Sequence, residues 1–289
     1  MERPNEVWTI GSILKWTGQY FAEKGVESPR LDAEVLLSHV LGKERIYLYV
    51  HFDEPLQADE IVRYKDMIKK RVLRMPVAYI IGYKEFMGLE FTVSPAVLIP
   101  RPDTEILVEA VIERLKEKES VNFVDIGTGS GAIVLSLLAN LPQAVGSTVD
   151  ISEAAIEVAR GNAEKLGVTS RVSFFHGDVY SPVKDQLFDV IISNPPYIPD
   201  ADIEGLQPEV KCEPHGALAG GTDGLDFYRK LVDEGASLLK PGGFMAFEVG
   251  IHQAAAVAKL ADAFAELGEV SIVKDYGGIE RVVIIDKRE

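Results

Sequence analysis

The sequence predicts an α/β protein in which a small all-helical region and a β-hairpin precede a mostly parallel sheet. Three observations predict this fold class. Apolar residues recur at helical spacing through residues 1–80, a short strand-like pattern broken by glycine and proline occupies residues 83–99, and short apolar runs alternate with helical stretches from residue 121 onward. Strands that alternate with helices form a parallel sheet that helices cover on both faces.

The first 80 residues predict three amphipathic helices, because their apolar residues are spaced by three and four. The helices are expected at about residues 10–21, 31–41 and 58–73. We expect Leu31 of the second helix and Val62 of the third to face inward. Lys and Arg side chains, including Arg71, fall on the polar face of the third helix. This basic face fits either a solvated surface or a docking surface for an acidic or RNA-bound partner.

The connecting segment, residues 81–99, predicts a short strand pair between the two regions. Pro100 and Pro102 follow it and interrupt regular structure. We expect Asp103 to cap a helix that ends near Lys118.

From residue 121 to the end, the pattern predicts seven strands with helices between them. The segment between the last two strands, around residues 275–278, is too short for a helical crossover, so these two strands are expected to pair antiparallel. The strands are expected at residues 121–126, 145–150, 171–176, 188–193, 242–249, 269–274 and 280–285, and the helices at about residues 130–140, 152–166 and 225–239.

Composition and charge limit the kinds of partner. The 289 residues are 47% hydrophobic and 26% charged, and the net charge is −15. Residues 1–80 are neutral, so the whole acidic excess lies in residues 81–289. A protein that binds nucleic acid usually gathers Lys and Arg on its contact face, so this distribution weighs against duplex DNA or RNA as the main substrate. With one cysteine and no apolar run of about 18 residues, we expect a cytoplasmic protein without a membrane segment.

A glycine-rich turn follows the first strand of the predicted sheet. Gly127, Gly129 and Gly131 alternate there, and a helix begins at once. Such glycines allow a tight turn and a close approach of backbone to a ligand. Asp150 ends the second strand, where its carboxylate can accept hydrogen bonds from the hydroxyl groups of a ribose. The pattern predicts a nucleoside-bearing cofactor, but it does not decide between NAD and S-adenosylmethionine.

The fourth predicted strand ends in Asn194-Pro195-Pro196-Tyr197. Ligands bind at the carboxyl ends of parallel strands, so this loop shares an edge with the glycine turn. Consecutive prolines lack N–H groups, which leaves carbonyl acceptors, and Asn194 adds a side-chain acceptor. Two acceptors can hold the two N–H bonds of an amide or amine and turn its lone pair toward a methyl group. Tyr197 supplies an aromatic wall that favours a sulfonium cation.

These motifs resemble class I methyltransferases that act on exocyclic or amide nitrogen. Further segments are similar to the release factor glutamine N5-methyltransferases, the PrmC/HemK family. They are Leu98-Ile99-Pro100-Arg101-Pro102-Asp103-Thr104-Glu105, Ser28-Pro29-Arg30-Leu31-Asp32-Ala33-Glu34, Glu213-Pro214, Ala217-Leu218, Gly220-Gly221, Asp223-Gly224-Leu225-Asp226-Phe227-Tyr228 and Lys274-Asp275-Tyr276.

The resemblance implies a Rossmann-like sheet of seven strands, with S-adenosylmethionine as methyl donor. It implies a helical substrate-recognition domain over residues 1–80, a hairpin linker over 81–99 and a methyltransferase domain over 100–289. The methyl acceptor would be the side-chain amide nitrogen of the glutamine in the Gly-Gly-Gln loop of peptide-chain release factors. We expect a monomer that has no direct nucleic-acid partner.

The resemblance also implies site residues. Asn194, Pro195 and Tyr197 would be catalytic, and together with Pro196 they would bind the glutamine. Some members carry an aromatic residue where Val179 follows Asp178, so contact with the adenine would here be made by Val179. The cofactor would be bound by Gly127, Thr128, Gly129, Ser130, Gly131, Asp150, Val179 and Asn194.

Two residues before the sheet allow two interpretations each. Arg101 would either orient the substrate loop or pack at the start of a helix, and Glu105 would either bond a nearby backbone group or cap that helix. The five histidines are scattered without the spacing of metal ligands, so we expect no metal.

Three other functions compete with this one. An adenine-N6 nucleic-acid methyltransferase would share the Asn-Pro-Pro-Tyr loop, but the acidic charge and the lack of a target-recognition insert count against it. An NAD-dependent oxidoreductase would leave that loop unexplained. A noncatalytic binding module would not require Asn194 and Tyr197.

Overall fold

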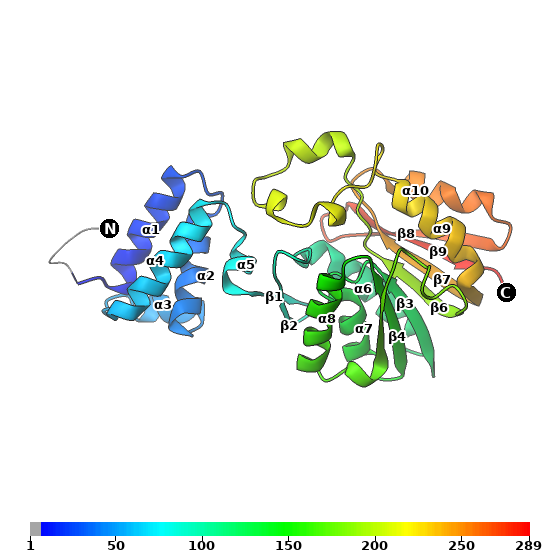
Figure 1. Ribbon diagram of the computed structural model, residues 1–289, viewed down its shortest axis with the longest axis horizontal. Coiled ribbons are helices and arrows are strands. Elements are labelled where there is room, and N and C mark those ends of the chain that lie inside the picture. The colour runs from blue at the N-terminus through cyan, green and yellow to red at the C-terminus, as the bar shows by residue number, and fades with distance from the viewer. Residues whose placement is uncertain (1–6) are drawn as a thin grey trace. The chain divides into compact units, whose positions relative to one another are not determined.

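The computed structural model describes residues 7–289, and the chain forms two compact units (Figure 1). The first unit runs to Gly82 and also contains Pro208–Cys212. The second unit contains Tyr83–Gln207 and Glu213–Glu289. Each unit buries a hydrophobic core of its own.

The described part of the first unit is helical, and the three predicted helices are confirmed. Thr9 and Ser12 cap the first helix reciprocally, each side chain bonding the other's backbone N–H. Two further helices were not predicted, because five or six residues are too few for a periodic apolar pattern. The helices are α1 (Ile10–Glu23), α2 (Pro29–Leu41), α3 (Arg45–Val50), α4 (Ala58–Val72) and α5 (Val77–Ile81), followed much later in the chain by the 3-10 turn η3 (Val210–Cys212).

The burial of three side chains in this unit differs from the prediction. Leu31 is 45% exposed and Val62 is 67% exposed, so the expectation that they face inward was wrong. Arg71, expected on the polar face, is buried. Its guanidinium donates to Asp32 at 2.7 Å and to Glu209 at 2.8 Å. These partners compensate for the burial of the charge, and they lie too far away in sequence for helical periodicity to indicate them.

The second unit opens with the predicted hairpin, formed by β1 (Tyr83–Phe86) and β2 (Leu89–Thr92), which pair antiparallel. Phe86 and Phe91 are fully buried in the core of this unit. The hairpin is therefore fixed to the sheet by its own aromatic side chains.

A seven-stranded sheet forms the centre of the second unit, as predicted. Its strand order is β5-β4-β3-β6-β7-β9-β8. The first five strands in this order are parallel, and β9 runs antiparallel to both β7 and β8. The strands are β3 (Val121–Ile126), β4 (Ala144–Asp150), β5 (Val172–His176), β6 (Phe188–Ser193), β7 (Leu239–Glu248), β8 (Leu267–Lys274) and β9 (Glu280–Lys287).

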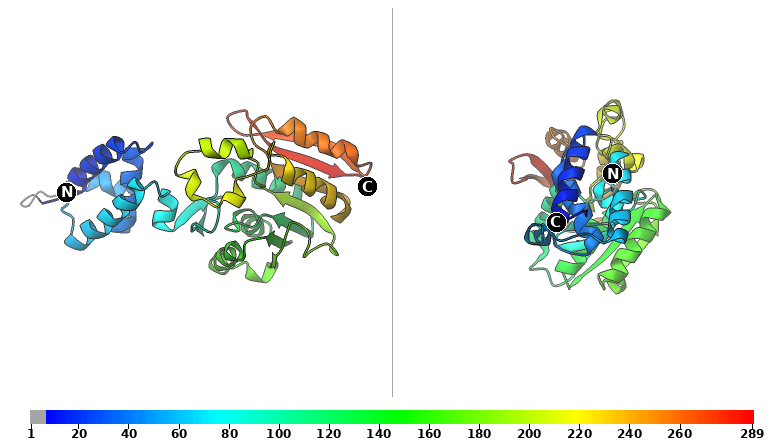
Figure 2. Two further views of the ribbon diagram at one scale, coloured as in Figure 1. Left: turned by 45° about the horizontal axis from the view of Figure 1, so that its top comes forward. Right: turned by 90° about the vertical axis from the view of Figure 1, so that its left-hand side faces the viewer.

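Alternate residues of the strands feed two separate cores. Val190 and Ile192 of β6 pack into one core, while Ile191 packs into the other. This alternation follows from the period of two in an extended chain. Figures 1 and 2 show helices on both sides of the strands, with α9 (Asp226–Leu238) and α10 (Ala254–Leu260) on one of them.

The remaining helices of this unit are α6 (Pro102–Leu115), α7 (Ala132–Asn140) and α8 (Glu153–Lys165). The predicted cap of α6 was wrong. The capping position belongs to Arg101, Pro102 occupies the first turn, and Asp103 lies inside the helix. Proline at the first helical position costs no hydrogen bond, because that N–H has no partner in the helix. The helix α10 was not predicted.

The order of the strands sets the place of a ligand site. The chain passes from β3 outward to β4 and β5, and then returns to place β6 on the other side of β3. The loops after β3 and β6 therefore leave the same edge in opposite directions and open a crevice there. The glycine turn follows β3 and Asn194 follows β6, so both candidate loops flank this crevice.

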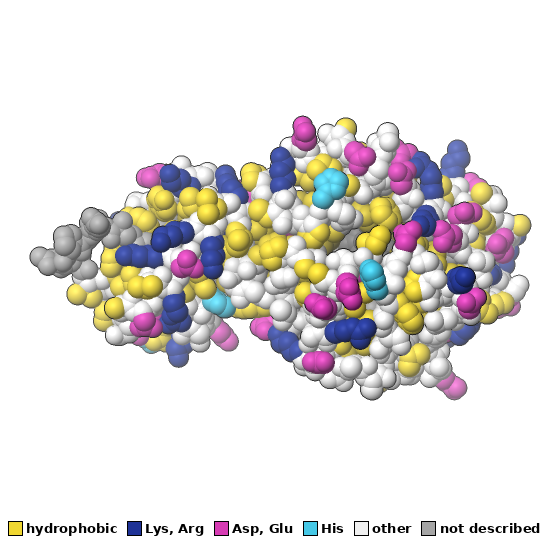
Figure 3. All heavy atoms as spheres, viewed as in Figure 1, with side chains coloured by type: hydrophobic (Ala, Val, Ile, Leu, Met, Phe, Trp, Pro, Cys, Tyr) yellow, Lys and Arg dark blue, Asp and Glu magenta, His cyan; other side chains and the backbone are white. Residues whose placement is uncertain are grey.

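The surface charge differs between the units. On the face of the first unit seen in Figure 3, Lys and Arg side chains gather. Arg63, Lys69 and Lys70 of α4 are exposed. On the face of the second unit seen there, acidic and basic side chains are intermixed.

Candidate active site

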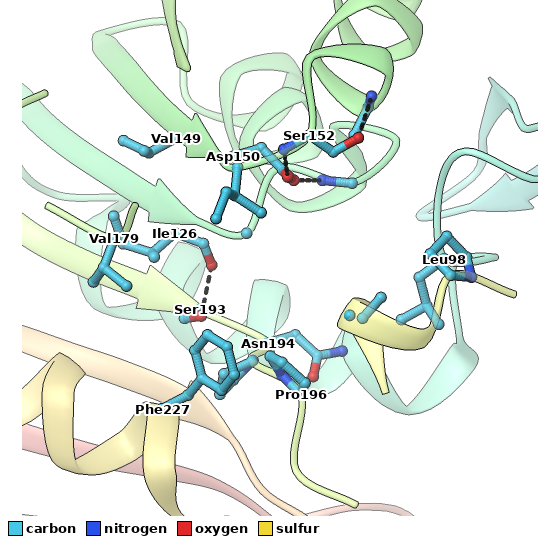
Figure 4. A pocket seen from close by; sticks show the side chains of 18 of the residues that line it. Leu98, Ile126, Val149, Asp150, Ser152, Val179, Ser193, Asn194, Pro196 and Phe227 are labelled. Carbon is cyan, nitrogen blue, oxygen red and sulfur yellow. Dashed lines mark hydrogen bonds between the residues drawn. The ribbon is translucent and has the colours of Figure 1, made fainter. Parts of the chain in front are cut away.

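A cavity of about 380 Å³ opens at the edge of the sheet where the loops after β3, β4 and β6 meet. This volume falls within the range of small-molecule sites. Figure 4 shows Asp150 and Ser152 on one side of it and Asn194, Pro196 and Phe227 on the opposite side. The cavity therefore lies between the predicted cofactor carboxylate and the predicted catalytic loop.

The glycine turn presents bare backbone to this cavity. Gly127 and Gly129 line it, and their φ angles of 90° and 53° lie in the left-handed region that favours glycine. A Cβ added at Gly129 would meet no atom within 4 Å. Open space beside the backbone at this point is what a closely bound ligand requires. Gly131 has φ 81° and occupies the capping position of α7.

Asp150 is held in place by the two loops around it. The N–H of Gly129 donates to Oδ2 at 2.9 Å, and the N–H of Ser152 donates to Oδ1 at 2.8 Å. Each carboxylate oxygen keeps a second lone pair, so the group can still accept hydrogen bonds from a vicinal diol. The cavity thus has the acceptor that a ribose needs.

Apolar side chains line the rest of the cavity. Val179 is buried and has a φ of 47°, a strained conformation for a β-branched residue. Phe227 and Leu231 come from α9, and Leu98 comes from the segment before α6. These walls suit a flat, weakly polar ring such as a nucleobase. Sequence reasoning missed Phe227 and Leu98 as site residues, although both lie in segments that carry the family resemblance.

Other predicted site residues lie near the cavity without lining it. Thr128 and Ser130 are buried, and the Thr128 hydroxyl bonds the hydroxyl of Thr148 at 2.7 Å. The ring of Tyr197 packs against the core below the sheet edge. These residues shape the two loops, whereas Asn194, Pro195 and Pro196 reach the cavity wall.

The side-chain amide of Asn194 has a defined orientation. Its Nδ2 donates to the hydroxyl of Thr104, a buried residue of α6, at 3.1 Å. This contact commits the nitrogen to the protein and leaves Oδ1 as an acceptor for a ligand. No sequence signal assigned a role to Thr104.

The backbone of the Asn-Pro-Pro-Tyr loop is braced by the segment that follows it. Ile198 pairs with Ala219, and the N–H of Gly220 donates to Ile198 O at 2.8 Å. The side chain of Gln253 donates to Tyr197 O at 2.9 Å. Gly224 packs so closely that an added Cβ would lie 2.3 Å from Tyr197 O. The loop is therefore held in place both by these neighbouring segments and by its two prolines.

Burial changes the titration of two groups beside Asn194. Burial and the nearby carboxyl of Glu248 raise the pKa of Tyr197 to about 12, so its phenol stays protonated at neutral pH. Burial raises the pKa of Glu248 itself to about 7, although hydrogen bonds from Thr104 and Asn194 oppose the shift. Glu248 was not among the predicted site residues.

The two ambiguous residues before the sheet have clear partners. Arg101 forms an ion pair with Glu213 and donates to Ile99 O at 3.0 Å. Glu213 also accepts from the N–H of Ile99 at 3.0 Å. Glu105 accepts from the N–H of Met87 in the hairpin turn at 2.7 Å, which is the nearby backbone bond that the sequence allowed. Both residues thus tie loops together.

Residues 7–289 lack a membrane-spanning helix and a cluster of metal ligands. No helix there is both long and apolar enough to cross a membrane. Within the same range, no group of three or more His, Cys, Asp and Glu side chains is arranged to hold a metal ion.

Comparisons with known proteins agree along the whole chain. A family model described as the PrmC N-terminal domain matches residues 12–82, and one described as the methyltransferase small domain matches residues 103–206. The release factor glutamine methyltransferase of Geobacter sulfurreducens is 47% identical over 285 residues, which cover 98% of each protein. That of Moorella thermoacetica is 46% identical over 281 residues, which cover 97% of this chain and 99% of the relative.

Solved structures show the same fold at lower identity. A methyltransferase from Pyrococcus furiosus matches with a TM-score of 0.52 and 20% identity, covering 70% of this chain and 90% of that one. The hMettl16 catalytic domain matches with a TM-score of 0.58 and 15% identity, covering 76% and 81%. The second unit therefore has the α/β fold of class I methyltransferases.

Proposed function

Because the chain belongs to the release factor glutamine methyltransferase family, we propose that it methylates N5 of the glutamine in the Gly-Gly-Gln loop of release factors, with S-adenosylmethionine as donor. One observation carries the chemistry. Asp150 and the glycine turn face Asn194 and Pro196 across a single cavity. This arrangement can hold a nucleoside-bearing donor and a planar amide in contact.

The residues present fit the donor. Asp150, Gly127, Gly129, Val179 and Phe227 all line the cavity. Asp150 would accept from the ribose, the bare backbone at Gly127 and Gly129 would lie along the methionine part, and Val179 with Phe227 would enclose the adenine. Thr128, Ser130 and Gly131 act by shaping the turn. When bound, S-adenosylmethionine supplies a methyl group on a sulfonium, which is electrophilic enough to react with a weak nucleophile.

The Asn-Pro-Pro-Tyr loop acts by orienting the acceptor. The lone pair of an amide nitrogen is delocalised into its carbonyl, so the nitrogen reacts only when it is held in a suitable orientation. Oδ1 of Asn194 and the carbonyl of Pro195 accept hydrogen bonds from the two N–H groups of the glutamine amide. Pro196 and Tyr197 shape the pocket around the glutamine. Because Tyr197 stays protonated, it supports the loop from the core as a neutral group and does not serve as a base.

The organisation of the chain follows the same proposal. Residues 1–80 form a helical domain that recognises the release factor, residues 81–99 form the linker, and residues 100–289 form the catalytic domain. We further propose that the protein is a monomer, works in the cytoplasm and has no direct contact with nucleic acid. The acidic excess of residues 81–289 supports the last point.

A substitution at Gly224 tests whether the braced loop matters for turnover. Gly224 has φ 75° and contacts Tyr197 O, so Gly224→Ala would displace the Asn-Pro-Pro-Tyr backbone. We expect kcat for factor methylation to fall at least about 10-fold, since small misplacements of an oriented group are costly. Steady-state kinetics at saturating donor measures it.

Gly278 offers a matched control. Its φ of 82° gives the same backbone strain on substitution, but an added Cβ would meet no atom within 4 Å. Gly278→Ala should lower stability by about 1 kcal/mol and leave kcat unchanged. Equal kcat values for the two variants would show that the close contact with Tyr197 has no role.

Incubation of the purified protein with labelled S-adenosylmethionine tests the proposal against the adenine alternative. Separate reactions contain release factor, duplex DNA or RNA as acceptor. We expect label on the release factor alone. Label on a nucleic acid and none on the factor would contradict the proposal and favour an adenine-N6 nucleic-acid methyltransferase.

A further inference from the structure

A buried carboxyl group lies directly behind the proposed catalytic asparagine. Glu248 ends β7, and β7 pairs with β6, so that Ser193 lies beside Phe247. The residues that follow this pair are Asn194, directly after β6, and Glu248, the last residue of β7. The residue Glu248 is only 1% exposed, and it does not line the cavity.

Glu248 and Asn194 are neighbours at the end of two paired strands, and Thr104 lies with them. The side chains of Thr104 and Asn194 both favour the ionised form of the Glu248 carboxyl group and so lower its pKa. Thr104 also accepts from Nδ2 of Asn194 at 3.1 Å. One carboxyl oxygen of Glu248, Oε2, has no hydrogen-bond partner among the described residues. The backbone is fixed, because the hydroxyl of Tyr228 donates to Glu248 O at 2.7 Å.

From this arrangement we propose that Glu248 is a positioning residue, which holds the side chain of Asn194 so that Oδ1 and not Nδ2 faces the substrate amide. The inference rests on the proposed function, because it assigns Glu248 a part in orienting the same glutamine. Glu248 acts through Thr104 and Asn194 and does not touch the substrate.

The physical reason is that an amide side chain has two ends of nearly equal size. If the Asn194 amide turned over, its NH₂ group would meet the NH₂ group of the glutamine, and donor would oppose donor. An ionised carboxylate can only accept hydrogen bonds, so it selects the orientation in which Nδ2 points back into the protein. A protonated carboxyl also donates, and this selection is then weakened.

The groups around Glu248 set the pH at which this change occurs. Asp103 of α6 disfavours ionisation, and Arg281 of β9 favours it. Arg281 is itself paired with Asp103 at 3.1 Å and with Asp275 at 3.0 Å. Tyr197 and Tyr228 are further titratable neighbours, and their raised pKa values keep them neutral. The pKa of Glu248 is raised to about 7, so its charge changes near neutral pH.

The expected pH profile follows from the sign of this shift. As pH rises through about 7, Glu248 ionises and kcat for factor methylation should rise with it to a plateau. Glu248→Gln should give a kcat about 10-fold below that plateau, without the rise near pH 7, because a carboxamide neither titrates nor selects. Glu248→Leu removes both acceptors and should fall further, to about 100-fold below.

Stability should respond in the opposite direction. The pKa of Glu248 is raised in the folded protein, so its contribution to stability is present below about pH 4.5 and is lost as pH rises through about 7. Glu248→Gln should therefore melt at a higher temperature than the wild type at pH 8.5, by about 2–4 °C or more, and at nearly the same temperature at pH 5. If Glu248 had only a structural role, its substitution would not raise stability while lowering turnover.

Asp103→Asn provides a second variant that leaves Glu248 in place. Removing this carboxylate takes away a charge that disfavours ionisation and frees Arg281 to favour it. The rise in kcat should therefore move to lower pH, while the plateau at pH 8.5 stays unchanged. This variant changes only an exposed carboxylate, so its fold should be retained.

The experiment measures kcat between pH 5.5 and 9 for the wild type and these three variants, with release factor as acceptor and saturating donor. We expect the plateau value of kcat to be highest for the wild type, lower for Glu248→Gln and lowest for Glu248→Leu. The kcat of Glu248→Gln should not rise near pH 7. In Asp103→Asn, kcat should rise at a lower pH than in the wild type. A plateau kcat of the Glu248 variants within twofold of the wild type would overturn this inference alone. So would a rise of kcat in Asp103→Asn at the same pH as in the wild type. A wild type that methylates no release factor would overturn the proposed function and this inference together.

Discussion

Asn194→Ala should reduce methyl transfer to the release factor to background, with kcat at least about 10³-fold lower. The substitution removes Oδ1, the acceptor that fixes one N–H of the glutamine, in a site that excludes water. Loss of a single preorganised hydrogen-bonding group in other active sites costs about 10²–10³-fold. Here it also leaves the hydroxyl of Thr104 without the donor that it accepts from. Single-turnover kinetics with preformed donor complex measures the chemical step.

The matched control for this substitution is Asn140→Ala. Asn140 ends α7, is exposed, and donates to Ser136 O within its own helix. It should keep kcat within about twofold of the wild type. If Asn194→Ala also kept near-normal turnover, the proposed orientation of the amide by this side chain would be wrong.

Asp150→Ala should act mainly on the donor. The variant loses the acceptor for the ribose hydroxyls and also frees the N–H groups of Gly129 and Ser152. Hydrogen bonds to a charged group contribute about 1.5–3 kcal/mol each, so we expect Kd for S-adenosylmethionine to rise by about 10²-fold or more. Calorimetric titration of the protein with donor gives this value directly, and kcat at saturating donor should fall much less.

Asp150→Asn refines the same measurement. It keeps one oxygen acceptor and the shape of the side chain, so its Kd should lie between those of the wild type and Asp150→Ala. Asp185→Ala, at an exposed aspartate that does not line the cavity, controls for the loss of one negative charge. An unchanged donor affinity in Asp150→Ala would place the ribose elsewhere.

The parts of the fold that depend on local pattern were predictable. Every parallel strand contains apolar residues, and the glycine turn and the Asn-Pro-Pro-Tyr loop stand at strand ends. Position along the chain therefore decides position at the sheet edge. The roles of the residues in those loops stay predictions. Parallel strands bring their carboxyl ends together at one edge of the sheet. The local pattern therefore indicates which side chains can lie close to one another.

The partners of these residues could not be predicted in the same way. Glu248 lies near the end of an apolar run, inside the strand predicted over residues 242–249. Only the pairing of β7 with β6 brings it beside Asn194, and only the packing of α6 adds Thr104. A carboxylate inside an otherwise apolar predicted strand was the available signal.

In the helical unit, the predicted burial of three side chains was wrong for a related reason. Apolar periodicity assumes that charged side chains face water, whereas Arg71 and Asp32 are buried as an ion pair. Such pairs form between helices that are distant in sequence, so a single helix carries no sign of them. Where they occur, the buried face of a helix shifts away from its apolar stripe, as Leu31 and Val62 show.

The proposed acceptor of the methyl group is the side-chain nitrogen of one glutamine. The most direct measurement is peptide mass mapping of a release factor after incubation with the protein and S-adenosylmethionine. We expect one added methyl group on the peptide that carries Gly-Gly-Gln, located at the glutamine by fragmentation. A factor in which that glutamine is changed to alanine should gain none. A methyl group at any other residue, or equal methylation of the altered factor, would contradict this proposal.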